Sequence, residues 1–332
     1  MRPVLVTGAN GFLGAAVCQA LLEKGISVRG LTRTRDAALE PRVSRFLATD
    51  LTDARALDAA LAGTEAVIHL AGRAHVVDSD ASESERAFQR ANVDGTRAVM
   101  EAAVRQGVRR LLFTSSIKVM GEYAGRPWTE EDIPRPADAY GRSKLAAEEL
   151  LRKAAAAGEI EVGIVRPPLV YGPGVKANML QLFRLVDAAI PLPFKDTVNT
   201  RSIVYSRNVA DGLLALLTTP KLKNDVFFLT DGDGISTPAL IELIAQSLGK
   251  PLNLFSFPDG LLRRMARLGD SVGRLVPMPL NSSALDRLTG SLECSSAKIR
   301  SALGFVPRWS TGEGIAATAR WYRGKGRQGF AA

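Results

Sequence analysis

Cysteine, aromatic residues and long apolar runs are scarce in this chain of 332 residues. The two cysteines, Cys18 and Cys294, have no second Cys or His at ligand spacing, so we expect neither a disulfide framework nor a metal site. No apolar run approaches the roughly 20 residues that span a membrane, and the run at residues 4–6 is too short for a signal peptide. The sequence therefore predicts a cytoplasmic protein with no membrane span.

Aromatic residues make up 6% of the chain, against 46% hydrophobic residues and a net charge of +9. The arginines are scattered and are not interleaved with aromatic residues, so we expect no nucleic-acid partner. The charge could serve an anionic membrane surface or a site for anionic small molecules, or it could reflect composition alone. A chain of this length and hydrophobic content can bury the core of one globular unit or of two closely joined domains.

The first half of the chain alternates short β-branched runs with Ala-rich amphipathic segments, the pattern of a parallel sheet covered by helices. We predict an α/β fold, a Rossmann-type doubly wound parallel sheet with a smaller C-terminal α/β substrate region, in which ligands sit at the carboxyl ends of the strands. The expected strands are residues 4–7, 27–31, 45–48, 66–70, 110–114, 162–166, 201–205 and 226–229, and the expected helices begin near Gly11, Ala54, Glu85 and Tyr140 or cover 236–247, 261–275 and 295–302.

The rhythm changes after Arg166, where prolines and glycines interrupt regular structure. A second region that packs on the first would place the active site between them. The expected organisation is a dinucleotide-binding domain at 1–170 to which 201–230 returns, a substrate-binding region at 171–200 and 231–322, and a tail at 323–332.

A glycine-rich loop, Gly8–Gly14, follows the first expected strand and opens a helix. Glycines permit the turn and let the backbone approach a pyrophosphate, which the helix N-terminus attracts. The position between strand and helix indicates a dinucleotide site, and the alternative is a purely structural turn. The residues assigned to cofactor binding here are Gly8, Asn10, Gly11, Phe12, Leu13 and Gly14.

The end of the second strand bears on the choice of cofactor. An acidic residue there accepts hydrogen bonds from the adenosine ribose, whereas an arginine pairs with a 2′-phosphate. This turn carries Arg33 and Arg35, which favour NADP(H) over NAD(H), although both could be ordinary solvated arginines. His69 is interpreted as a satisfied core histidine, and the role of His75 stays open. The residues expected to flank the rest of the cofactor are Asp50, Leu51, Leu70, Ala71 and Gly72.

Tyr140 and Lys144 lie four residues apart and share one face of an expected helix. A tyrosine with the ordinary pKa of about 10 is a poor base at neutral pH, but a neighbouring ammonium group and a positive nicotinamide ring favour the phenolate. Tyr140 is therefore predicted to be the general acid/base of an alcohol-to-ketone step. Ser116 would bond the reacting oxygen, and Lys144 would also hold the nicotinamide ribose.

Over nearly its whole length the chain resembles the extended short-chain dehydrogenase/reductases, in particular the nucleotide-sugar epimerase, dehydratase and ketoreductase family. The matching elements are Gly8–Gly14, Asp50–Leu51, His69–Gly72, Ala91–Thr96, Ser115–Gly121, Tyr140–Lys144 and Arg166–Gly174.

The resemblance implies a catalytic triad of Ser116, Tyr140 and Lys144 and an enzyme acting at C4 of a nucleotide-sugar such as a UDP-hexose. It also implies a homodimer working in bacterial surface-polysaccharide synthesis. Cofactor contacts are implied for Asn92 and Pro167, and substrate contacts for Lys118, Asn178, Arg201 and Arg287.

The chain departs from the dehydratases that it resembles. They carry Thr-Asp-Glu at the positions where this chain has Ser116, Ile117 and Lys118. Dehydration is disfavoured because no carboxylic acid stands there to expel a hydroxyl as water. Leu169 and Met120 also replace residues that many relatives carry at substrate contacts. A 4-epimerase and a 4-keto reductase both remain open, beside a reductase of a non-sugar carbonyl and a cofactor-sensing or scaffold protein without catalysis.

Overall fold

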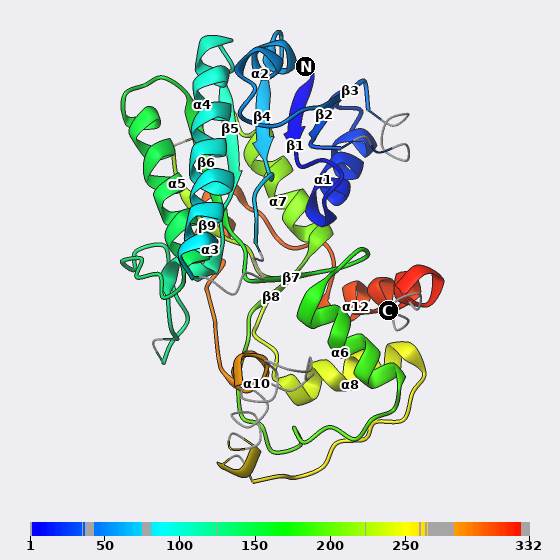
Figure 1. Ribbon diagram of the computed structural model, residues 1–332. Coiled ribbons are helices and arrows are strands. Elements are labelled where there is room, and N and C mark those ends of the chain that lie inside the picture. Colours follow the sequence, from blue (N-terminus) through cyan, green and yellow to red (C-terminus); the bar gives the residue numbers. More distant parts are fainter. Residues whose placement is uncertain are drawn as a thin grey trace. The chain divides into compact units, whose positions relative to one another are not determined.

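The computed structural model describes residues 2–34, 36, 43–74, 81–123, 125–222, 224–258, 260–262, 264 and 282–326. Its main element is a parallel sheet of seven strands in the order β3-β2-β1-β4-β5-β6-β9, which confirms the predicted fold class (Figure 1). The strands are β1 (Val4–Thr7), β2 (Val28–Thr32), β3 (Arg45–Ala48), β4 (Ala66–His69), β5 (Arg110–Thr114), β6 (Glu161–Arg166) and β9 (Val226–Phe228).

Helices cover both faces of this sheet because the strand residues on each face are apolar. On one face, strand residues such as Leu5 and Val67 share a core with Leu57, Val99 and Leu151. The helices on that face are α2 (Ala54–Leu61), α4 (Gly95–Arg105) and α5 (Ala139–Ala156). Two further helices of the same unit, α1 (Phe12–Glu23) and α7 (Ser206–Thr218), pack against each other. Also present are α3 (Ala81–Phe88), a π-helix (Gln89–Asp94), a 3₁₀ helix (Ile117–Met120) and α11 (Ala297–Leu303).

The chain forms two compact units, of which the first contains residues 1–168, 206–230 and 294–308. In the second unit, β7 (Leu169–Tyr171) pairs in parallel with β8 (Ile203–Tyr205). Its helices are α6 (Ala177–Asp187), α8 (Thr237–Leu248), α10 (Ser282–Thr289), α12 (Thr311–Trp321) and a π-helix at Tyr322–Gly326.

The unit boundaries differ from the expected ones, beginning with the second unit, which starts at Leu169 and not at residue 171. Residues 201–205 belong to the second unit because β8 pairs with β7 and not with the large sheet. Residues 294–308 belong to the first unit. There the backbone of Cys294 forms an isolated β-bridge with that of Trp128, and the Lys298 ammonium group donates to the Asp225 carboxylate. The binding role of each unit remains a prediction.

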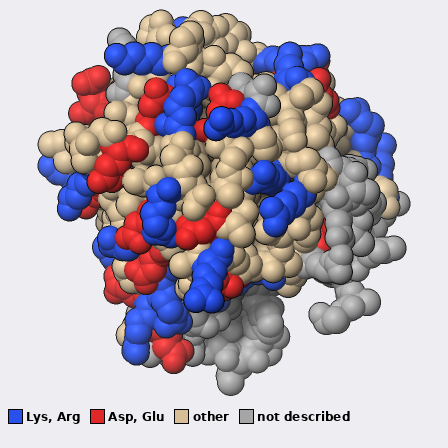
Figure 2. Space-filling model, turned by 90° about the horizontal axis from the view of Figure 1, so that it is seen from above, with Lys and Arg blue, Asp and Glu red and all other residues tan. Residues whose placement is uncertain are grey.

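Most expected elements are present within two residues of their predicted bounds. The helix expected near Glu85 begins earlier, at Ala81, and the expected helix at 261–275 lies largely outside the described residues. Within the described part of the chain, no helix combines the length and apolarity needed to cross a membrane. On the face drawn in Figure 2, positive side chains are interspersed with negative ones.

Candidate active site

The glycine loop leads from β1 into α1 through a turn that only small residues allow. Gly8 has φ of +67°, and a Cβ on Gly14 would lie 2.1 Å from the Gly8 carbonyl oxygen. Gly11 is the N-cap of α1 and makes no side-chain hydrogen bond, so the cap residue itself leaves the first backbone N–H groups of the helix available. Such a helix end is suited to a phosphate, and the loop therefore fits the predicted dinucleotide site.

The turn after β2 is closed by the Thr32 hydroxyl, which donates to the Thr34 carbonyl at 2.6 Å. Arg33 is exposed there. Hydrogen bonds from Thr52 hold the pKa of Asp50 below its ordinary value, and the charge of Arg33 contributes to the same shift. Arg33 and Asp50 are thus near each other, whereas Arg35 lies outside the described residues.

His69 is a fully buried link between two strands and the helices beside them. Its Nδ1 lies 2.7 Å from the Thr7 hydroxyl and its Nε2 lies 3.1 Å from the Thr96 hydroxyl. Thr96 donates to the Asn92 carbonyl, so it accepts from His69 Nε2–H, and Nδ1 is left to accept from Thr7. Burial lowers the pKa of His69 to about 3, and the nearby Lys144 contributes to this shift. His69 is therefore a neutral core histidine, as predicted, while His75 lies outside the described residues.

Asn92 belongs to the π-helix and uses its amide within the protein. Its Oδ1 accepts from Arg73 N–H at 2.8 Å, and its Nδ2 donates to the Arg73 carbonyl and to the Ser143 hydroxyl. Ser143 in turn donates to the Tyr140 carbonyl. Asn92 thus holds the 72–73 turn against the helix that carries Tyr140. A Cβ on Gly72 would lie 2.9 Å from Asn92 Oδ1, so a larger residue there would displace the Asn92 amide.

The structure brings Ser116, Tyr140 and Lys144 together in the first unit. Ser116 follows β5 and caps the 3₁₀ helix by accepting from Lys118 N–H at 3.2 Å. Asp138 caps α5, so Tyr140 and Lys144 lie in its first two turns. The Ser116 hydroxyl is hydrogen-bonded to the Tyr140 side chain. This arrangement can hold an oxygen of a bound alcohol beside a proton donor or acceptor.

Burial dominates the electrostatics of the Tyr140–Lys144 pair. It raises the pKa of Tyr140 to about 12, against the lowering effect of the Ser116 hydrogen bond. It lowers the pKa of Lys144 to about 8, partly offset by the Glu148 carboxylate. Lys144 Nζ donates to the Thr114 carbonyl at 2.8 Å and lies 4.4 Å from the centre of the Phe113 ring.

The predicted substrate residues are divided between the two units. Lys118 is exposed in the first unit, with Nζ 3.6 Å from Asp138 Oδ2. In the second unit, Asn178 lies in the first turn of α6, and Arg201 Nη1 donates to the Gly290 carbonyl at 2.7 Å. Arg287 lies in α10, but its side chain is outside the described residues. A common contact of these residues with one ligand stays a prediction.

Several supporting residues were not singled out from the sequence. Thr7, Thr96 and Ser143 complete the hydrogen-bond chains around His69 and Asn92. Thr96 and Ser143 fall within the matching motifs, so their position gave a signal, although the motif does not reveal a partner. Thr7 is the last residue of an apolar strand and carries no such signal.

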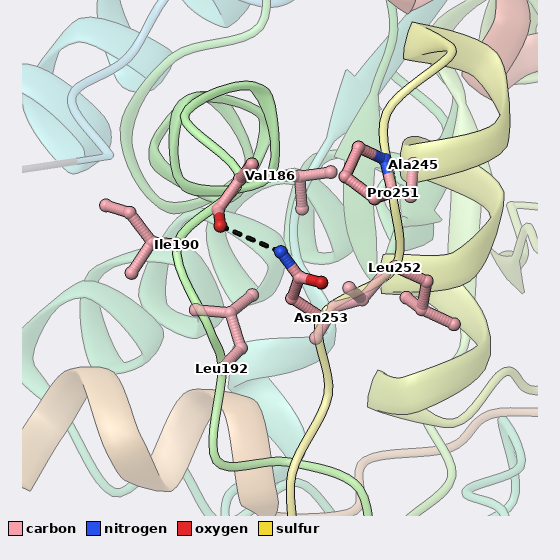
Figure 3. A pocket seen from close by; sticks show the side chains of 9 residues that line it. Val186, Ile190, Leu192, Ala245, Pro251, Leu252 and Asn253 are labelled. Atoms are coloured by element: carbon pink, nitrogen blue, oxygen red, sulfur yellow. Dashed lines mark hydrogen bonds between the residues drawn. The ribbon is translucent and has the colours of Figure 1, made fainter.

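The second unit contains a small apolar hollow (Figure 3). It is lined by residues including Val186, Ile190, Ile241 and Leu252, and Asn253 Nδ2 donates to the Ala189 carbonyl at 3.0 Å beside it. Its volume of about 10 Å³ is no larger than the space one water needs. The hollow is too small for a substrate.

Comparisons with known proteins agree with this geometry. Residues 4–228 match the model of the NAD dependent epimerase/dehydratase family. The chain is 35% identical to a UDP-glucose 4-epimerase of Vibrio cholerae, covering 96% of this chain and 95% of that protein. It is 30% identical to a farnesyl-dihydroquinoline-oxide ketoreductase of Stigmatella aurantiaca, covering 93% of each. The structure of MoeE5 in complex with UDP-glucuronic acid and NAD superposes with a TM-score of 0.75 at 28% identity, covering 97% of this chain and 99% of that one.

Proposed function

Because this chain belongs to the NAD-dependent epimerase/dehydratase family, we propose that it oxidises or reduces C4 of a nucleotide-sugar, as a 4-epimerase or a 4-keto reductase. The observation that carries the proposal is the placement of Ser116, at the end of β5, against Tyr140, at the start of α5, with the buried Lys144 one turn further on and bonded to the Thr114 carbonyl. A UDP-hexose or a UDP-linked N-acetylated 6-deoxy-4-keto sugar is the proposed substrate. The V. cholerae relative and MoeE5, with its bound UDP-sugar, support this class of substrate.

The residues present fit a nicotinamide dinucleotide. The glycine loop and the uncapped start of α1 would hold the pyrophosphate, and Lys144 would reach the nicotinamide ribose. Bound there, the nicotinamide would supply the acceptor or donor for hydride transfer at the sugar carbon. Pro167, whose carbonyl accepts from Ile117 N–H, is proposed to lie at the same site.

The side chains of the triad supply the proton chemistry in this proposal. Tyr140 takes the proton of the sugar hydroxyl when that carbon is oxidised and returns it on reduction. Ser116 donates to the reacting oxygen, and the Lys144 ammonium group stabilises the Tyr140 phenolate. Ile117 and Lys118 supply no carboxylic acid, so we propose that the chain does not dehydrate its substrate.

A substrate panel tests this proposal. Purified protein is incubated with UDP-glucose, UDP-galactose and their N-acetylated and 4-keto forms, first without added cofactor and then with NADH or NADPH. Interconversion of the two C4 epimers without net cofactor consumption identifies an epimerase. Stoichiometric consumption of NAD(P)H with a 4-keto sugar identifies a reductase. Absence of both activities overturns the nucleotide-sugar proposal.

The second candidate is an NADPH-dependent reductase of a non-sugar carbonyl. The exposed Arg33 at the end of β2 favours a cofactor with a 2′-phosphate, and the S. aurantiaca relative is named as a ketoreductase. Reduction of a hydrophobic ketone by NADPH, together with failure of the whole UDP-sugar panel, would favour this candidate.

Arg33→Ala is expected to narrow or reverse a preference for NADPH over NADH. A charge-assisted contact to phosphate contributes about 1.5–3 kcal/mol, and the variant loses that contact. Fluorescence titration of both cofactors into wild type, Arg33→Ala and the exposed-arginine control Arg97→Ala measures the preference. A wild-type protein that prefers NADH contradicts the prediction.

Arg201→Ala is expected to weaken binding of UDP by about 10- to 100-fold, the effect of losing one charge-assisted contact to the diphosphate. The alternative is a structural role, since Arg201 donates to the Gly290 carbonyl beside the buried Asn199. Calorimetry with UDP in the presence of NAD, beside thermal melting, separates the two. Unchanged UDP affinity would exclude the diphosphate role, and Arg320→Ala on α12 is the matched control.

A further inference from the structure

A buried ion pair continues the face of α5 that carries Tyr140 and Lys144. Glu148 is 0% exposed at its side chain and Arg166, the last residue of β6, is 1% exposed. The two side chains form a bidentate pair, with Arg166 Nε 2.9 Å from Glu148 Oε1 and Nη2 2.6 Å from Oε2. Glu148 follows Lys144 by four residues, so both belong to the helix face that Tyr140 begins.

Arg166 connects this helix to the segment that carries Ser116. Its third nitrogen, Nη1, donates to Met120 Sδ at 3.2 Å, and Met120 ends the 3₁₀ helix that Ser116 caps. The backbone of the same strand end reinforces the connection. Ser115 N–H donates to the Val165 carbonyl at 2.7 Å, and Ile117 N–H donates to the Pro167 carbonyl at 3.0 Å.

A contribution to folding stability does not by itself explain why this buried ion pair is present. Removing two charges from water costs several kcal/mol per ion, and apolar replacement of a whole buried pair is often neutral or stabilising. A bidentate arginine pair instead fixes direction and distance, because the planar guanidinium matches a carboxylate in one geometry. The elements that it fixes here carry the two halves of the proposed catalytic triad.

We propose that Arg166 and Glu148 are positioning residues, which hold the Tyr140–Lys144 helix in register with Ser116 so that the Ser116–Tyr140 hydrogen bond forms. The inference rests on the proposed function for its kinetic consequence only. The pair does not touch the reacting atoms, and it acts through α5 and the 3₁₀ helix. The Glu148 carboxylate also raises the pKa of Lys144, an effect that the variant Arg166→Lys leaves in place because it keeps Glu148.

Other charged groups face the pair and must be considered in its test. Arg152, one turn further along α5, lies 3.4 Å from Glu148 Oε2 but is 45% exposed. Glu130 accepts from Phe228 N–H, and the charge of Arg166 contributes to its pKa. Neutralising Glu148 alone would leave Arg166 buried without its carboxylate, so both members should be changed together.

The test variant is Glu148→Leu with Arg166→Met, which removes both charges and keeps the volume. Arg166→Lys is a second variant that keeps the charge but loses the bidentate geometry. The chain offers a matched control at the opposite end of β5 and β6. There Arg110 pairs with Glu161 at 2.5 Å and donates to carbonyls at the end of α7, far along the strands from Ser116. Arg110→Met with Glu161→Leu is that control.

Two measurements decide the proposal. The first is the tyrosinate absorbance of Tyr140 against pH with NAD bound, taken as the difference between each protein and its Tyr140→Phe counterpart. The second is the pH profile of kcat and KM on the substrate identified by the panel. We expect the titration midpoint and the profile to move to higher pH in the test variants, and kcat to fall roughly 100-fold, the cost of a misplaced catalytic group, with KM little changed.

The control should alter melting temperature without moving either midpoint. A folded test variant with wild-type midpoint and turnover overturns the proposal, as does an equal shift in the control, since that would indicate a general structural effect. If the double variant does not fold, Arg166→Lys gives the same decision. If wild type turns over no nucleotide-sugar, the proposed function fails, but the tyrosinate titration still decides the positioning role.

Discussion

Tyr140→Phe is expected to lower turnover by roughly 10²- to 10⁴-fold, the usual contribution of a general acid/base. Only the chemical step should be affected, because phenylalanine keeps the aromatic ring and loses only the hydroxyl beside Ser116. The centre of that ring lies 5.8 Å from the centre of the Phe88 ring. Folding and NAD affinity should therefore remain close to wild type. Steady-state kinetics, NAD titration and thermal melting are the measurements.

The pH dependence of the oxidation step follows from the same group. Burial raises the pKa of Tyr140 to about 12, so the phenolate is scarce near neutrality before the positive nicotinamide ring lowers it. Oxidation needs the phenolate, so its rate should rise with pH up to the Tyr140 pKa with NAD bound. Tyr140→Phe should remove this dependence along with most of the rate.

A matched control is available in the second unit. Tyr171 is another buried tyrosine, whose hydroxyl donates to Asp231 at 2.6 Å. Tyr171→Phe should lower stability and leave the pH profile unchanged. Near-normal turnover in Tyr140→Phe would show that the acid/base is a different group, and a wild type that binds NAD without turning over any tested substrate would favour the scaffold alternative.

The parts of the site that lie close together in sequence could be predicted from it. The glycine loop follows β1 directly, and Tyr140 and Lys144 lie one helical turn apart. Local backbone geometry therefore determines which residues these groups lie beside. Ser116 could be placed because the ends of parallel strands meet at one edge of the sheet. These inferences need only the type of each element and the order of the motifs.

Interactions between distant residues could not be predicted in the same way. Arg166 was recognised as part of a motif, but Glu148 is a carboxylate on an otherwise ordinary amphipathic helix, and only the fold brings the two together. The same holds for β8, whose sequence resembles any short strand and whose partner is β7. Hydrophobic pattern indicates that a strand exists, but not which strand it pairs with.

Arg201 shows a different limit. The family resemblance implied a substrate contact for it, and in the structure its Nη1 donates to the Gly290 carbonyl. A guanidinium can support the fold and bind an anion with different N–H donors, so a contact to the protein does not decide between the two roles. A residue's role as ligand or as support is therefore a question of relative energies, which a binding measurement answers and a pattern does not.

Lys144→Met is expected to reduce both turnover and NAD affinity, in contrast to Tyr140→Phe. The Lys144 ammonium group would stabilise the phenolate and bond the nicotinamide ribose, so its loss affects both steps. We expect turnover to fall at least as far as in Tyr140→Phe, roughly 10²- to 10⁴-fold. Unchanged NAD affinity would contradict the ribose role. Lys153→Met, an exposed lysine on the same helix, is the control.

Stability should respond to Lys144→Met in a direction that identifies the buried ammonium group. Burial lowers the pKa of Lys144 from its ordinary value of 10.5 to about 8, so between these values the unfolded chain binds more protons than the folded one. The wild type therefore gains stability as pH rises through this interval, whereas the methionine variant lacks this gain. The stability of the variant relative to wild type should be highest below pH 8 and should fall as the pH rises towards 10.5. Melting temperatures that change in parallel across this interval would show that Lys144 is not held as a destabilised cation, and would contradict the prediction.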